Sequence, residues 1–378
     1  MKDKTRFLFV LGAHRSGTSL TAGACDALGA NLGRDFIAAS DENPKGFFED
    51  QAVVTLNDRL LRSASLSWDC VGYLWQEDFL GEHYRPYHRA AVDLVRERFA
   101  GVAIAALKDP RLCILLPFWR SVVSEALDAD IYYLLTVRDP AHCAGSQRAR
   151  HIADGDFHLL GQRREHAVML WATYLHHSLQ DIDPTRSLVV SYDALVAQPR
   201  RELSRLGQFL GVAVTPAMAD AYSEQFVDAQ LNRSAAKSAP GRQRLPQVWL
   251  WADSVYSHLL SLSSKDSLPV AELDALRAAL AIDAQTQTYL RETQRMYGYA
   301  YKKVLSLRHR LIRVIREIGE GHVREDELQF QQKLLREQLE DTERRLQEIL
   351  DSKAWRMIVR FRNIKAALGL GPRPGKDG

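Results

Sequence analysis

The sequence predicts an α/β protein built on a mostly parallel sheet flanked by helices, with a helical extension behind it. Short apolar runs rich in β-branched residues read as strands, at 7–11, 102–107, 131–137 and 187–191. Helix-like stretches separate these runs, and such alternation is the pattern of a parallel sheet wrapped by helices. With 378 residues, the chain is long enough for one large domain with appendages.

The first strand leads directly into a glycine-rich turn. Residues 12–19 read Gly-Ala-His-Arg-Ser-Gly-Thr-Ser, the skeleton of the nucleotide-binding P-loop, G-x-x-x-x-G-K-[ST]. Thr18 stands where that motif has its phosphate-binding lysine, and a cation, Arg15, lies three residues upstream. Glycines let backbone N–H groups approach an anion, and the helix expected over 18–28 adds the positive end of its dipole. The turn therefore predicts an anion site in a P-loop NTPase-like fold.

The missing lysine bears on the chemistry of this turn. Kinases and ATPases with a P-loop use that lysine on the β- and γ-phosphates, so phosphoryl transfer from ATP is disfavoured here. The run Arg15-Ser16-Gly17-Thr18-Ser19 resembles the P-loop sulfotransferase family, which transfers the sulfuryl group of 3′-phosphoadenosine-5′-phosphosulfate (PAPS). The resemblance implies that these five residues surround the 5′-phosphosulfate of PAPS.

A second strand, 131–137, ends in another candidate anion site. Asp139 suits a helix cap and Pro140 suits the first turn of the helix that follows. Ser146 then lies about two turns into that helix, near enough for Arg138 and Ser146 to converge on one anion. The alternative is an exposed arginine at a strand end and a serine on the helix surface. In the sulfotransferase family an Arg and a Ser at this spacing bind the 3′-phosphate of PAPS.

A third resemblance to the family begins at the strand 187–191. The strand is followed by Tyr-Asp-Ala-Leu at 192–195 and by a helix that Gly211 closes. Tyr192 is either a wall of the adenine pocket or a residue of the core. Family members often close a basic loop over the cofactor further along the chain, which implies a role for Arg233; a plain flexible loop fits that segment equally.

Two further segments are candidates for catalysis. The breaker-rich segment 43–50 precedes an amphipathic helix, and the resemblance implies that an acid here, Glu49, removes the acceptor's proton. A carboxylate suits this role if its site raises its pKa, although the family's better-known His base is missing, and Glu49 is otherwise a favourable charge at a helix start. Lys108 and Arg111 open another helix, where two cations indicate a bound anion, unless both are merely solvated.

Composition narrows the classes of protein that fit. A net charge of +3 gives no argument for binding nucleic acid, and four scattered cysteines have neither metal-ligand nor disulfide spacing. No apolar run reaches the roughly 18 residues of a membrane-spanning helix, and the start lacks a signal-peptide layout. We therefore expect a cytoplasmic protein that needs no metal.

The C-terminal third differs in kind. We expect a sulfotransferase-like domain over 1–245, a helical extension over 246–322, a short coiled coil over 323–352, and a basic amphipathic, then disordered, tail over 353–378. The heptad pattern predicts either a homo-oligomer through this coiled coil or a solvated single helix. The tail predicts peripheral contact with the inner face of the membrane, or packing against the protein itself. The heptad positions are Leu328, Gln332, Leu335, Leu339, Thr342, Leu346 and Ile349.

Together these features predict a PAPS-dependent sulfotransferase whose acceptor is a hydroxyl or amine of a glycan or small metabolite. Its predicted catalytic residues are Glu49, Arg15 and Lys108. The alternatives are a kinase-like phosphotransferase that uses ATP and Mg²⁺, and a nucleotide-binding scaffold that acts through its coiled coil.

Overall fold

The computed structural model describes most of the chain. The described residues are 4–38, 46–64, 66–69, 79–154, 164–226, 247–281, 303–304, 306–307, 309–315 and 325–351. They fall into two compact units, of which the first holds the sheet and residues 73–281 and the second comprises residues 61–72 and 282–364. The expected site residue Arg233 and the expected basic tail lie outside the described residues.

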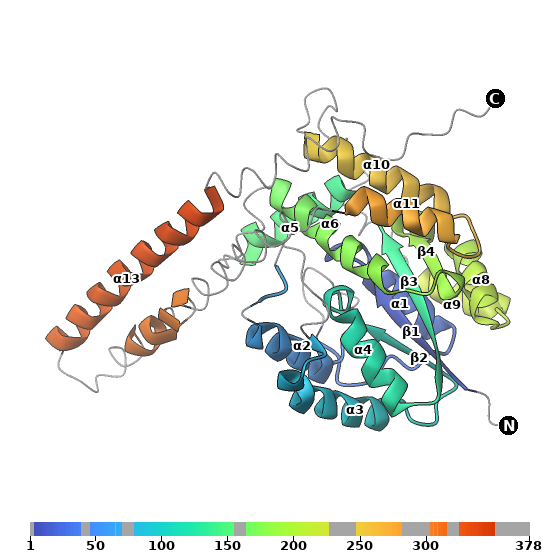
Figure 1. Ribbon diagram of the computed structural model, residues 1–378, viewed down its shortest axis with the longest axis horizontal. Helices are drawn as coiled ribbons and strands as arrows, with labels where there is room; N and C mark the ends of the chain where they lie inside the picture. Colours follow the sequence, from blue (N-terminus) through green and yellow to red (C-terminus); the bar gives the residue numbers. More distant parts are fainter. Residues whose placement is uncertain are drawn as a thin grey trace. The chain divides into compact units, whose positions relative to one another are not determined.

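Four parallel strands form the sheet, in the order β2-β1-β3-β4 (Figure 1). Their bounds are Thr5–Leu11 for β1, Ile104–Lys108 for β2, Ala129–Val137 for β3 and Ser187–Ser191 for β4. Val10 lies opposite Lys108 of β2, and Val137 lies opposite Ser191 of β4. The carboxyl ends therefore meet at one edge, where the loops after β1, β2, β3 and β4 emerge side by side. The predicted α/β fold with a parallel sheet is confirmed.

One face of the sheet packs against the first helix and the helices that follow β4. Leu8 and Val10 of β1 face this side, and they join Leu134, Leu188 and Val190 in one buried apolar cluster. The helices are α1 (Thr18–Ala27), α7 (Tyr192–Ala197), α8 (Pro199–Leu210) and α9 (Pro216–Gln225). Gly211 ends α8 in the left-handed conformation, as the sequence predicts.

The opposite face carries the helices between α1 and β4. Because side chains alternate along a strand, Phe7 and Phe9 point to this side, where Phe7 meets Phe99 edge-on and Phe9 stacks on Tyr133. These helices are α2 (Gln51–Ser63), the short 3₁₀ turn η2 (Glu82–Tyr84), α3 (Arg85–Phe99), α4 (Leu112–Ala126), α5 (Pro140–Asp154) and α6 (Arg164–Gln180). Among them α4 contacts α3, α6, β1 and β3.

Two helices beyond 245 belong to the same unit as the sheet. These are α10 (Gln247–Leu262) and α11 (Val270–Leu280), and both contact α6. The indole of Trp251 in α10 donates to the Ala279 carbonyl of α11 at 3.1 Å. Leu268 N donates at 3.1 Å to the carbonyl of Ser187, the first residue of β4, which follows the short 3₁₀ helix η4 (Pro184–Arg186). This layer therefore stands directly beside β4.

The described part of the second unit contains a long helix, α13 (Glu325–Asp351). Leu335 and Leu339 of α13 pack with Leu307, Leu311 and Val314, which lie on helical segments of the same chain. Two of the predicted heptad positions thus have an apolar partner within the chain. Assembly of two copies through this helix stays a prediction.

Candidate functional site

The turn after β1 forms a cradle of backbone groups at the carboxyl edge of the sheet. Gly17 has φ 94°, a left-handed conformation that favours glycine, and α1 starts at the next residue. A Cβ at Gly12 would lie 2.7 Å from Ser16 Oγ and 2.8 Å from Thr18 Cγ2, so only glycine leaves room for this fold of the loop. The first N–H groups of a helix have no acceptor within it. The loop therefore offers donors and a dipole to an anion, as the sequence predicts.

At one end of the loop, Arg15 contacts Arg138 and Ser146, the two residues predicted to bind the second anion. Its backbone is left-handed, with φ 68°. Its Nε donates to Ser146 Oγ at 2.9 Å, and Arg138 Nη1 donates to the Arg15 carbonyl at 3.2 Å. Asp139 caps α5 by accepting from Ala141 N at 2.7 Å, which places Ser146 on the side of the helix that faces the loop. Two guanidinium groups and one hydroxyl are thus gathered beside the cradle.

Tyr192 closes this end of the site. The guanidinium carbon of Arg138 lies 4.0 Å from the centre of the Tyr192 ring, and a Cβ at Gly17 would lie only 2.2 Å from the ring edge. Burial raises the pKa of Tyr192. The neighbouring Asp193 accepts from Tyr256 of α10 at 3.2 Å. The ring is therefore fixed between the loop backbone, Arg138 and the outer helices.

At the other end of the loop lies a buried lysine. Lys108 is the last residue of β2, and its Nζ donates to Ser19 Oγ at 3.3 Å, to the Phe47 carbonyl at 2.8 Å and to Glu49 Oε1 at 2.5 Å. The loop itself has Thr18 at the usual lysine position. The neighbouring strand thus supplies an ammonium next to α1.

Glu49 is a buried carboxylate, 8 % exposed. Burial raises its pKa, and the ammonium of Lys108 acts in the opposite direction. Phe48, the residue before it, has φ 55°, a left-handed conformation that a bulky side chain rarely adopts. This bend lets both the Phe47 carbonyl and the Glu49 carboxylate face Lys108. The raised pKa is what the predicted base needs.

Asp50 anchors the start of α2 directly behind Glu49. Its Oδ1 accepts from Ala52 N at 2.9 Å as a helix cap, and its Oδ2 accepts from Arg98 Nε of α3 at 2.9 Å. Further along α2, Asn57 donates to the buried carboxylate of Asp109 at 2.8 Å. The helix that follows Glu49 is therefore tied to α3 and to the end of β2.

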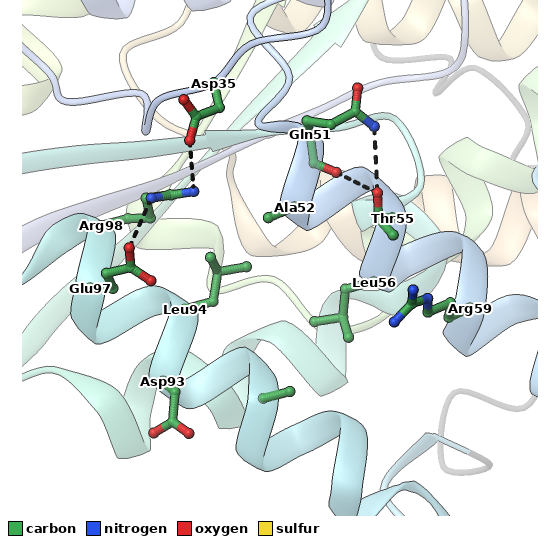
Figure 2. A pocket seen from close by; sticks show the side chains of 11 residues that line it. Asp35, Gln51, Ala52, Thr55, Leu56, Arg59, Asp93, Leu94, Glu97 and Arg98 are labelled. Atoms are coloured by element: carbon green, nitrogen blue, oxygen red, sulfur yellow. Dashed lines mark hydrogen bonds and ion pairs between the residues drawn. The ribbon is translucent and has the colours of Figure 1, made fainter.

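A groove of about 570 Å³ lies between α2 and α3 (Figure 2). Arg98 spans one end of it, with Nη2 3.2 Å from Asp35 and Nη1 3.2 Å from Glu97. Leu56 and Leu94 line its middle, and Arg59 lies at the far side. None of the predicted site residues lines this groove.

Arg111 differs from its neighbour Lys108 in its environment. Its guanidinium pairs with Asp58 at 2.8 Å and with Asp109 at 3.0 Å. Although burial lowers the pKa of Arg111, these two carboxylates raise it overall. Its positive charge is therefore compensated within the protein, and of the two cations at this helix start Lys108 alone contacts the loop.

The structure thus brings the predicted site residues to the two ends of one loop. Arg15, Arg138, Ser146 and Tyr192 gather at one end, and Lys108 and Glu49 gather next to Ser19 at the other. Sequence reasoning missed the Phe47 carbonyl and the left-handed Phe48. The only sequence signal there is the cluster of breakers before them, which predicts a turn but not its geometry.

The residues that the structure describes contain no group of three or more His, Cys, Asp or Glu side chains that could hold a metal ion. No helix among them is long and apolar enough to cross a membrane.

Comparison with known proteins gives one family and two solved structures. The model of the sulfotransferase family matches residues 128–216, from the start of β3 to the start of α9. The chain is similar to the sulfotransferase domain of the Synechococcus PCC 7002 olefin synthase, with 17% identity and a TM-score of 0.40 over 68% of this chain and 97% of that one. It is also similar to the sulfotransferase domain of the curacin biosynthetic pathway, with 15% identity and a TM-score of 0.39 over 68% and 99%. No curated protein sequence matches it.

Proposed function

We propose that this chain moves the sulfuryl group of PAPS to a hydroxyl or amine acceptor, a glycan or small metabolite, because the sulfotransferase family model matches its residues 128–216. The family match covers Arg138, Ser146 and Tyr192. The loop at 12–19 and the segment 43–50 precede the match, and the sequence predicts the same chemistry for both. In this proposal PAPS is the donor substrate, and its two charged ends occupy the two ends of the loop.

The residues present suit such a donor. A side chain at Gly12 would clash with Ser16 and Thr18, so the loop between Gly12 and Thr18 presents backbone to a ligand. This matches the close approach of a 5′-phosphosulfate to N–H groups. Arg138 and Ser146 would hold the 3′-phosphate, since a guanidinium fork pairs well with phosphate oxygens. Tyr192, with Arg138 against its ring, would flank the adenine.

The chemical step assigned to the chain is an in-line displacement at sulfur. An electron pair of the acceptor oxygen or nitrogen forms the new bond to sulfur, while the bond from sulfur to the bridging phosphate oxygen breaks and its electron pair stays on that oxygen. Glu49 takes the proton from the acceptor. Lys108, Arg15 and the loop amides stabilise the negative charge that develops on the bridging oxygen and the sulfuryl group. The products are the sulfated acceptor and adenosine 3′,5′-bisphosphate (PAP).

One observation carries the proposal. The ammonium of Lys108 lies at hydrogen-bond distance from both Ser19 of the loop and Glu49. A donor in the loop would therefore present its sulfuryl group next to a carboxylate whose pKa is raised by burial, which is the arrangement that acceptor activation requires.

Ligand-induced stabilisation separates this function from the phosphotransferase alternative. PAP or PAPS at 100 times its Kd should stabilise the folded chain by about 2.7 kcal/mol, because it binds only the native state. ATP with Mg²⁺ at the same concentration should give no comparable shift of Tm. Stabilisation by ATP and Mg²⁺ but not by PAP would overturn the proposal.

A further inference from the structure

The ammonium of Lys108 has no N–H to spare. A lysine ammonium carries three N–H donors, and Lys108 directs them at Ser19 Oγ at 3.3 Å, the Phe47 carbonyl at 2.8 Å and Glu49 Oε1 at 2.5 Å. Ser19 follows the loop after β1 that would hold the sulfuryl donor, whereas Phe47 and Glu49 belong to the segment before α2. One cation therefore connects the loop with the proposed base.

A sulfuryl donor bound in the loop would compete with Glu49 for the Lys108 ammonium. A sulfuryl oxygen beside Ser19 would compete for an N–H of Lys108 and for a share of its charge, because the ammonium lies 3.3 Å from Ser19 Oγ. Among the three present acceptors, only Glu49 is an anion and competes for that charge. Lys108 is 3 % exposed and Glu49 is 8 % exposed, so water does little to weaken this competition.

The flexibility of the side chains also favours replacement of the Lys108–Glu49 contact by a contact between Lys108 and the donor. The lysine stem is flexible and its three donors rotate, whereas the Phe47 carbonyl is backbone held by the bend at Phe48. The Phe48 ring lies against Phe36 and Phe226, with ring centres 6.1 and 5.7 Å apart. The carbonyl contact is therefore the fixed one, and the contact to the Glu49 side chain is the one that can be released.

We propose that donor binding draws the Lys108 ammonium away from Glu49 and thereby frees this carboxylate to take the acceptor's proton. This inference rests on the proposed function and makes the base dependent on the donor, because Lys108 holds Glu49 until a sulfuryl donor fills the loop. The acceptor's proton is therefore removed only while donor is bound. A second consequence is that Glu49 opposes the binding of PAPS, although it is needed for turnover.

That opposition is measurable as a double-mutant cycle on donor affinity in the full chain. Titration calorimetry gives Kd for PAPS and for PAP, which lacks the sulfuryl group. In Glu49→Gln the ammonium is released in advance, so PAPS should bind about tenfold more tightly, the scale of one charge-assisted hydrogen bond. PAP should change by no more than about twofold. In the Lys108→Gln background, Glu49→Gln should leave the affinity for PAPS unchanged within about twofold.

A matched charge pair provides the control. Lys265 and Glu272, 3.3 Å apart near the start of α11, form an ion pair between residues that contact none of the site residues. Glu272→Gln should alter neither affinity. If Glu49→Gln tightens PAPS binding equally with and without Lys108, the effect is plain charge repulsion and the sharing of Lys108 is overturned. If the wild-type chain binds no PAPS, the proposed function itself fails, which is a distinguishable result.

A second measurement needs no lysine variant. Calorimetry in buffers of different ionisation enthalpy, at about pH 6, counts the protons taken up on binding. PAPS should cause more proton uptake with wild type than with Glu49→Gln, because only wild type has a carboxylate at position 49 that loses its cation, whereas the phosphate of PAPS titrates alike with both proteins. With PAP the two proteins should take up equal numbers of protons. Equal uptake of protons by the two proteins with PAPS, or an equally large difference between them with PAP, overturns the coupling.

Discussion

Replacing Arg138 by alanine tests whether the two ends of the loop serve different parts of the donor. Arg138 is 8 % exposed, donates to the Arg15 carbonyl at 3.2 Å and lies 4.0 Å from the Tyr192 ring centre. We expect Arg138→Ala to weaken PAPS binding strongly. Binding of adenosine 5′-phosphosulfate, which lacks the 3′-phosphate, should change much less.

The size of the effect follows from these contacts. A charge-assisted hydrogen bond to the 3′-phosphate contributes about 1.5–3 kcal/mol, or roughly 10- to 150-fold in Kd. Losing the arginine also removes its contact with the Tyr192 ring, about 0.5–2 kcal/mol. That second loss affects both ligands, because the ring flanks the loop in either case. The ratio of the two affinities should therefore fall by about tenfold or more, even if both affinities decline.

The assay is titration calorimetry with both ligands. Arg186→Ala is the matched control, since Arg186 also lies over a ring, 5.7 Å from the centre of Tyr132, and pairs with Asp130 at 2.9 Å. It stands at the start of β4, at the opposite end of the strand from Tyr192, and should affect neither ligand. Equal losses for PAPS and adenosine 5′-phosphosulfate in Arg138→Ala would refute the assignment of Arg138 to the 3′-phosphate.

Three further predictions concern the loop and the proposed base. Glu49→Gln should lower turnover by about 10²- to 10⁴-fold, and full activity in the variant would place the base elsewhere. Burial raises the pKa of Glu49 above its ordinary value of 4.5, so the decline of wild-type kcat/KM toward low pH, which marks protonation of the base, should have its midpoint above pH 4.5. Gly17→Ala should abolish PAP binding in a thermal-shift assay because its Cβ would lie 2.2 Å from the Tyr192 ring, whereas Gly29→Ala, with φ 82° and nothing within 4 Å, shares the backbone strain but not the clash and should bind normally. Phe48→Ala should lower the free energy of unfolding in urea more than Phe48→Gly by about 1–2 kcal/mol, since only glycine relieves the left-handed strain at φ 55°; the reverse order would show that the bend is not strained.

The parts of the site that are local in sequence could be predicted from it. Gly12 to Ser19 form the expected loop, and Asp139 caps the helix that carries Ser146. These features depend on turn chemistry and on helix starts, which a few neighbouring residues determine. The strand expected over 102–107 is instead Ile104–Lys108. Pairing with β1 decides where it ends, and it brings Lys108 into the strand opposite Val10.

The contacts between distant segments could not be predicted in this way. The meeting of Lys108 with Glu49 depends on a left-handed phenylalanine at 48, a conformation that packing against Phe36 and Phe226 stabilises and that no local propensity favours. The compensation of Arg111 by Asp58 likewise depends on how α2 lies beside the end of β2. The sequence identifies these residues as candidates, but tertiary packing decides their partners.

Transfer of a labelled group tests the central claim most directly. The full chain is incubated with sulfur-labelled PAPS, or with ATP labelled in its γ-phosphate plus Mg²⁺, and with the same panel of glycan, lipid, peptide and small-molecule acceptors. We expect sulfur label to appear in a hydroxyl- or amine-bearing acceptor together with stoichiometric PAP, and this transfer to be lost in Glu49→Gln. Transfer of phosphorus label from ATP, with no sulfur label in any acceptor of the panel, would contradict the proposed function.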